Sequence, residues 1–138
     1  MKSQIALVTI ITDNAPAMFR FYRDVLGFRP LAEINENAPG YAEFEHAGVR
    51  FALCTRGIMR NATGDTSYDQ PPQGQRIELA FPCDSPEQVD QDYDRLVSLG
   101  ATPIRAPENL PWNQRAAFFA DPDGNIHELF ADLPGGLR

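Results

Sequence analysis

Two segments of the chain show the same succession of strand-like and helix-like hydrophobic patterns. In the first segment, an apolar, β-branched run over residues 5–11 predicts a buried strand. Asn14 then offers a side-chain cap for a helix, and Gly27 offers the left-handed stop. Between them, apolar residues recur at i, i+3, i+4 and i+7, the spacing of one buried helix face: Met18, Phe21, Tyr22 and Val25.

The second segment repeats this order of elements. A strand is predicted over 77–81, and Ser85 with Pro86 forms a capping-box start for a helix that Gly100 ends. The buried helix stripe is predicted to be Val89, Tyr93, Leu96 and Val97. Each helix is followed by three short strand candidates: 29–33, 41–45 and 49–54 in the first segment, and 102–105, 115–120 and 126–130 in the second.

This repetition predicts an α+β fold of tandem βαβββ modules, with two facing sheets around a shared cleft. The chain is interpreted as a single domain over 1–138, with module one at 5–55 and module two at 76–132. Residues 56–75 form the linker, and their weak periodicity predicts no regular element. The linker is either a flexible connection or, because it is long, a lid or partner-contacting loop.

Composition narrows the possible partners. The 138 residues carry a net charge of −7 and a single lysine, so a nucleic-acid partner is not expected. No apolar stretch approaches the roughly 20 residues needed to cross a bilayer, so no membrane association is expected. Cys54 and Cys83 are too few for a disulfide framework, which favours a cytoplasmic location.

Two motifs carry a resemblance to a known family. The run FYRDVLGF at 21–28 and the run FADPDGNIHEL at 119–129 resemble the vicinal oxygen chelate superfamily. That group includes glyoxalase I, extradiol dioxygenases, and the bleomycin- and fosfomycin-resistance proteins. The resemblance covers roughly residues 5–132. It implies the paired-module fold and a homodimer, but no particular reaction, because one fold hosts many chemistries.

The resemblance also implies four metal-ligand positions, which fall here on Leu7, Ala52, Glu78 and Glu128. Leucine and alanine donate no ligand atom, whereas a catalytic metal normally takes at least three protein ligands. We therefore expect no metal cofactor. The alternative is a divalent metal ion held weakly by Glu78 and Glu128.

Two arginines are predicted beside these positions. Arg50 is two residues from Ala52 and Arg76 is two residues from Glu78, so strand alternation places both on the cleft face. They either contact a ligand or neutralise Glu78 and Glu128 in a structural network.

Two further side chains are candidates for the cleft or its surroundings. Trp112 follows a proline in a loop that lies at the cleft rim in similar proteins, where it could stack on a ligand or close the end of a sheet. His127 is adjacent to Glu128, and adjacent strand residues point to opposite faces. We therefore predict that His127 is a hydrogen-bonded packing residue on the helix side.

Two functions follow from these residues. The first is a metal-independent small-molecule-binding protein of the glyoxalase/bleomycin-resistance type, whose predicted ligand-binding residues are Leu7, Arg50, Ala52, Arg76, Glu78, Trp112 and Glu128. The second is a lyase, isomerase or dioxygenase of the glyoxalase I type. It would use Glu78 and Glu128 as metal ligands or as a general base.

Overall fold

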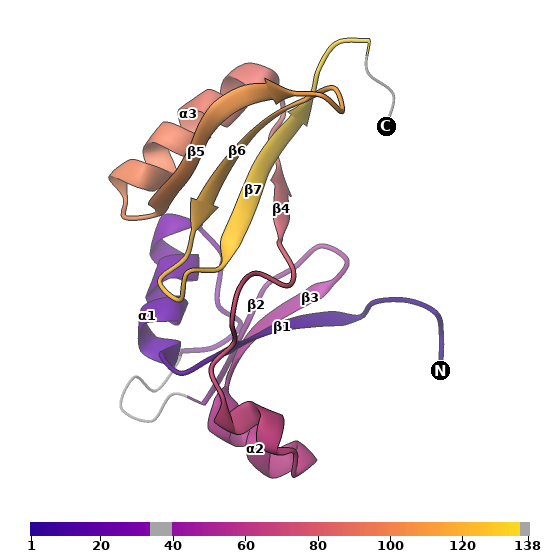
Figure 1. Cartoon of the computed structure of the whole chain (residues 1–138), viewed down its shortest axis with the longest axis vertical. Helices are drawn as coiled ribbons and strands as arrows, with labels where there is room; N and C mark the ends of the chain where they lie inside the picture. The colour runs from indigo at the N-terminus through magenta and orange to yellow at the C-terminus, as the bar shows by residue number, and fades with distance from the viewer. Residues whose placement is uncertain (34–39, 136–138) are drawn as a thin grey trace. The chain divides into compact units, whose positions relative to one another are not determined.

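The chain folds into two compact units, Met1–Gln73 and Gly74–Arg138. A computed structural model describes residues 1–33 and 40–135. Each unit combines one sheet with helical segments, as Figure 1 shows, and the mixed α+β class is thereby confirmed. None of the described helices is long and apolar enough to cross a membrane.

The first unit is built on a three-stranded sheet of order β1-β3-β2. Its strands are β1 (Leu7–Thr12), β2 (Tyr41–Phe44) and β3 (Arg50–Thr55). The central strand β3 runs parallel to β1 and antiparallel to β2. Helix α1 (Ala15–Arg20) continues directly into a π-helical turn over Phe21–Val25. The predicted cap is confirmed, because the Asn14 side chain accepts a hydrogen bond from the Ala17 backbone N–H.

Aromatic side chains fill the core of this unit. All four residues of the predicted helix stripe are buried. The ring centroid of Tyr22, from the helical segment, lies 5.0 Å from that of Phe51 of β3. Phe19 stacks on Phe44 of β2 with 5.8 Å between the ring centroids. These ring contacts join the helix to both strands, so burial of large apolar side chains accounts for the local fold.

The second unit is built on a four-stranded sheet of order β4-β7-β6-β5. Its strands are β4 (Ala80–Pro82), β5 (Thr102–Leu110), β6 (Gln114–Ala120) and β7 (Ile126–Asp132). Helix α3 (Pro86–Ser98) covers one face of this sheet (Figure 1). Ser85 caps the helix as predicted, with its Oγ accepting from the Gln88 backbone N–H at 3.1 Å.

Two predictions about regular structure were wrong. Residues 29–33 form no strand and contribute only an isolated bridge between Pro30 and Phe44. Pro30 has no N–H to donate, so this segment cannot extend a regular ladder. The strand predicted over 77–81 is also displaced, because β4 pairs only from Ala80 to Pro82.

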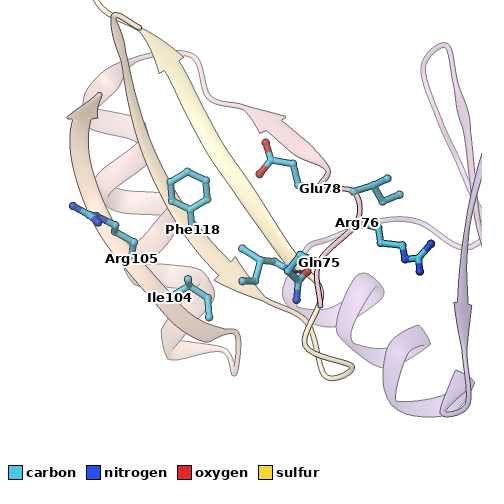
Figure 2. A pocket seen from close by; sticks show the side chains of 8 residues that line it. Gln75, Arg76, Glu78, Ile104, Arg105 and Phe118 are labelled. Carbon is cyan, nitrogen blue, oxygen red and sulfur yellow. Dashed lines mark hydrogen bonds between the residues drawn. The ribbon is translucent and has the colours of Figure 1, made fainter. Parts of the chain in front are cut away.

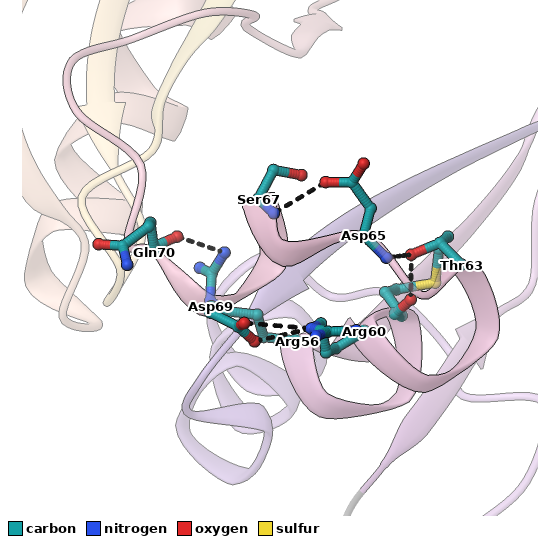
Figure 3. A network of polar contacts seen from close by, with 8 residues as sticks. Arg56, Arg60, Thr63, Asp65, Ser67, Asp69 and Gln70 are labelled. Carbon is teal, nitrogen blue, oxygen red and sulfur yellow. Dashed lines mark hydrogen bonds and ion pairs between the residues drawn. The ribbon is translucent and has the colours of Figure 1, made fainter.

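The linker also contains regular structure that the sequence pattern did not predict. It forms helix α2 (Arg56–Thr63) and a 3-10 turn (Thr66–Asp69). No residue of α2 is buried, and with eight residues the helix is too short for its period to be recognised in the sequence. Figure 3 shows the polar contacts of this segment: Arg60 of α2 pairs with Asp69 of the turn at 3.0 Å, and at the start of the turn the Asp65 carboxylate accepts from the Ser67 N–H at 2.8 Å.

Candidate functional site

Strand alternation gives the sheet of the second unit two different faces. His127 of β7 pairs in register with Phe119 of β6, and both are buried on the face that α3 covers. The neighbouring pair, Glu128 and Phe118, points to the other face. As predicted, therefore, His127 and Glu128 lie on opposite sides of the sheet.

A hollow of about 550 Å³ opens on the face that carries Phe118. Its floor is apolar and comes from Phe118, Ile126 and Ile104. Its wall is the segment 75–78, which precedes β4 and belongs to no strand. Arg105 of β5 completes the lining. The arrangement offers an apolar surface bordered by charged side chains (Figure 2).

The two predicted carboxylates lie on this face at different depths. Glu128 is 7% exposed, whereas Glu78 is exposed and lines the hollow. Ala80 is the register partner of Glu128, so Glu78 precedes that position by two residues. Glu78 points to the side on which Phe118 lies (Figure 2). This unit therefore brings Glu78 and Glu128 to one face, as the strand pattern predicted.

The two arginines that line the hollow have different surroundings. Arg105 is paired with Glu108 at 2.8 Å, so its charge is largely balanced. The side chain of Arg76 extends away from Phe118 (Figure 2). Among the described residues, neither Arg76 nor Glu78 makes a hydrogen bond or an ion pair. Arg76 therefore does not neutralise Glu78 through a direct contact.

Three predicted site residues belong to the first unit and share one face of its sheet. Arg50 is bound to Glu43, with Nη2 donating to Oε2 at 3.0 Å, and this hydrogen bond holds the pKa of Glu43 below its usual range. Ala52 is fully buried beside them in the sheet, and Leu7 is 38% exposed. Arg50 thus has a carboxylate partner within its own unit. A cleft shared between the two modules stays a prediction.

Trp112 does not line the hollow. It is 48% exposed in the turn between β5 and β6, at the end of that hairpin away from Phe118. Its proposed contact with a ligand stays a prediction. The sequence reasoning missed Phe118, Ile104 and Ile126, although alternation from Glu128 along the paired strands would have indicated the first of them.

The donor atoms do not fit a catalytic metal centre. Within residues 1–33 and 40–135, no group of three or more His, Cys, Asp or Glu side chains could hold a metal ion. Glu78 and Glu128 supply two carboxylates, one fewer than the protein ligands that a catalytic zinc site normally has. We therefore derive no chemistry through a metal at this site.

Comparisons with known proteins identify related chains. The family model described as Glyoxalase/Bleomycin resistance protein/Dioxygenase superfamily matches residues 4–129. A crystal structure of a glyoxalase/bleomycin resistance protein/dioxygenase from Nocardioides is 32% identical with a TM-score of 0.85, over 99% of this chain and 87% of that chain. An uncharacterised protein of Bacillus subtilis strain 168, YraH, is 28% identical over 91% of this chain and 96% of its own length. Lactoylglutathione lyase from Agrobacterium tumefaciens, 20% identical with a TM-score of 0.68 over 94% of each chain, shares the fold.

Proposed function

Because the chain belongs to the glyoxalase/bleomycin resistance protein/dioxygenase superfamily, we propose that it binds a small organic molecule, without a metal ion, in the hollow beside Phe118. The observation that carries this proposal is the hollow itself. Its volume of about 550 Å³ falls within the range of roughly 300–1,000 Å³ that is usual for small-molecule sites. Family membership alone does not specify a ligand or a reaction.

The lining suggests how a ligand is held. A flat or branched apolar group packs against Phe118, Ile104 and Ile126, where it loses contact with water. A polar or cationic group of the same molecule faces the Glu78 carboxylate, which has no intramolecular partner among the described residues. The apolar contact supplies most of the affinity, since an exposed charge contributes little by itself.

A binding experiment with three matched probes tests this proposal. Phenethylammonium, 2-phenylethanol and 3-phenylpropionate share a phenyl group and differ in charge, and calorimetry in the presence of EDTA measures their affinities. Phe118→Ala is expected to weaken binding about tenfold or more, because it removes a large apolar contact. The matched control Leu99→Ala changes an exposed apolar residue of the same unit outside the hollow. Equal affinities in the two variants, or no binding of any probe, would refute the proposed site.

A metal measurement tests the other half of the proposal. We expect protein purified without chelators to contain no stoichiometric divalent metal, because the described donors provide only two carboxylates at the predicted positions. Elemental analysis measures this directly. One metal ion per chain that is lost in Glu78→Gln or Glu128→Gln would contradict the metal-free site.

One observation favours an enzymatic alternative. Glu128 is almost buried on the same face as the hollow, and a carboxylate withdrawn from water can act as a general base. The reaction would then be a lyase or isomerase reaction of the glyoxalase I type without a metal. Turnover of a test substrate that Glu78→Gln or Glu128→Gln abolishes, in folded protein, would favour this alternative over simple binding.

A further inference from the structure

The wall of the hollow is attached to the sheet by side chains that are distant in the sequence. At its first residue, Gln75 makes two hydrogen bonds to the turn between β6 and β7. Its Nε2 donates to the Gly124 carbonyl oxygen at 2.8 Å, and its Oε1 accepts from the Ile126 N–H at 3.1 Å. A single side chain therefore docks this end of the wall onto the turn.

The other end of the wall is held through His127. The Leu79 N–H donates to Nδ1 of His127 at 3.2 Å, and the Leu79 carbonyl accepts from the Glu128 N–H at 2.9 Å. The imidazole is itself fixed, because its Nε2 lies 3.5 Å from Asp121 Oδ2. Phe119 and Phe81 pack edge-on against the ring, each at 5.9 Å. A buried histidine side chain thus accepts from the Leu79 N–H, while the β7 backbone donates to the Leu79 carbonyl.

The three residues between these attachments have no comparable support. Arg76, Ile77 and Glu78 are all exposed, belong to no strand, and line the hollow. Since few buried contacts restrain an exposed segment, its position depends on the bonds at its two ends. The position of Glu78 relative to Phe118 therefore depends on Gln75 at one end and, at the other, on His127 together with the backbone bond from Glu128 to Leu79.

We infer that Gln75 and His127 are positioning residues of the binding site, which set ligand affinity by holding the Glu78 wall against the sheet. The inference rests on the proposed function. It extends that function to His127, which lies on the opposite face of the sheet from the hollow. Its effect on the ligand is exerted through Leu79.

Two substitutions of His127 separate positioning from packing. In His127→Asn, the amide Oδ1 can occupy the place of Nδ1 and still accept from Leu79. In His127→Gln, the amide nitrogen can occupy the place of Nε2, which keeps the contact with Asp121 and loses the acceptor for Leu79. Both variants lose the ring contacts, so we expect similar losses of unfolding stability. For the phenethylammonium probe, we expect affinity within about threefold of wild type for His127→Asn and about tenfold weaker for His127→Gln.

Gln75 provides a second test that does not disturb the core. Gln75→Ala removes both bonds to the turn, and we expect the same probe to bind about tenfold more weakly. The control is Gln73→Ala, an exposed glutamine two residues earlier that does not line the hollow, for which we expect a change below twofold. Equal affinities in these two variants would overturn the role of Gln75.

Hydrogen exchange of the Leu79 and Ile126 amides provides a readout that needs no ligand. We expect faster exchange at Leu79 in His127→Gln than in His127→Asn, and faster exchange at Ile126 in Gln75→Ala. If exchange changes while the affinity of every variant equals that of wild type, the positioning role is refuted and the binding site stands. If wild type binds none of the three probes, the proposed function fails and the inference fails with it.

Discussion

The Asp121 carboxylate accepts three hydrogen bonds within the turn between β6 and β7. The residue is 2% exposed at the end of β6. Its Oδ1 accepts from the backbone N–H groups of Asp123 and Asn125, each at 3.0 Å, and its Oδ2 accepts from Asn125 Nδ2 at 2.8 Å. The same Oδ2 faces His127 Nε2. Asp121→Ala therefore leaves three donors without their acceptor.

The expected cost follows from these contacts. At about 1 kcal/mol net for each lost hydrogen bond, Asp121→Ala should reduce the free energy of unfolding by about 3 kcal/mol. Asp121→Asn keeps a carbonyl oxygen for the two backbone donors and should lose about 1 kcal/mol. Asp123→Ala is the matched control, because this carboxylate lies in the same turn and is exposed. We expect it to change stability by less than about 1 kcal/mol.

Urea unfolding followed by tryptophan fluorescence measures these differences. Trp112 is the chain's single tryptophan and lies in the turn between β5 and β6, so its signal reports on the second unit. A loss below about 1 kcal/mol for Asp121→Ala, or a loss equal to that of Asp123→Ala, would refute the reasoning from buried hydrogen bonds.

Three further predictions concern individual residues. Burial, together with the nearby Asp92 carboxylate, raises the pKa of the Cys83 thiol to about 11. We therefore expect iodoacetamide to label Cys83 slowly at pH 7 and faster toward pH 11, and Cys83→Ser identifies the part of the labelling that is due to this residue. Rapid labelling of Cys83 at pH 7 would contradict this expectation. Gly100 follows α3 with a φ of 119°, which strains any residue with a Cβ atom. Gly100→Ala should therefore reduce the free energy of unfolding by about 1–2 kcal/mol in the same urea titration. An unchanged unfolding midpoint would contradict the argument from backbone strain. The hydrogen bond from Arg50 lowers the pKa of Glu43 in the folded state. This bond therefore stabilises the fold at a pH above the unfolded-state pKa of Glu43, and the stabilisation is lost as the pH falls through the folded-state pKa. An NMR titration should place the Glu43 midpoint below the ordinary range and return it there in Arg50→Ala, and equal midpoints would count against the pairing.

Some features of the candidate site were accessible from the sequence. The period of two along β7 was sufficient to separate His127 from Glu128. Glu78 lies before β4, so its position depends on a segment outside the strand pairing. The cap at Ser85 followed from local patterns as well, and so did three of the four predicted stripe residues of α3, whereas Val97 is only half-buried. These features depend on contacts between residues close in sequence, or on alternation within a strand.

Other features depended on contacts that no local pattern encodes. Helix α2 has eight residues, none of them buried, and its Arg60 pairs with Asp69 of the following turn, so it left no long apolar period in the sequence. The pairing of Arg50 with Glu43 follows from the register of β2 on β3. Register is a property of the assembled sheet.

The amino-acid sequence by itself determined the class of fold and the family, because these follow from hydrophobic periodicity, helix caps and turn residues along the chain. The tertiary structure decided where the second unit is hollowed and how its wall is held. Gln75 reaches residues 49 and 51 positions later in the chain, and Leu79 reaches His127 across 48 positions. Side-chain contacts at such separations arise only after the sheet has formed, because strand pairing brings these segments together.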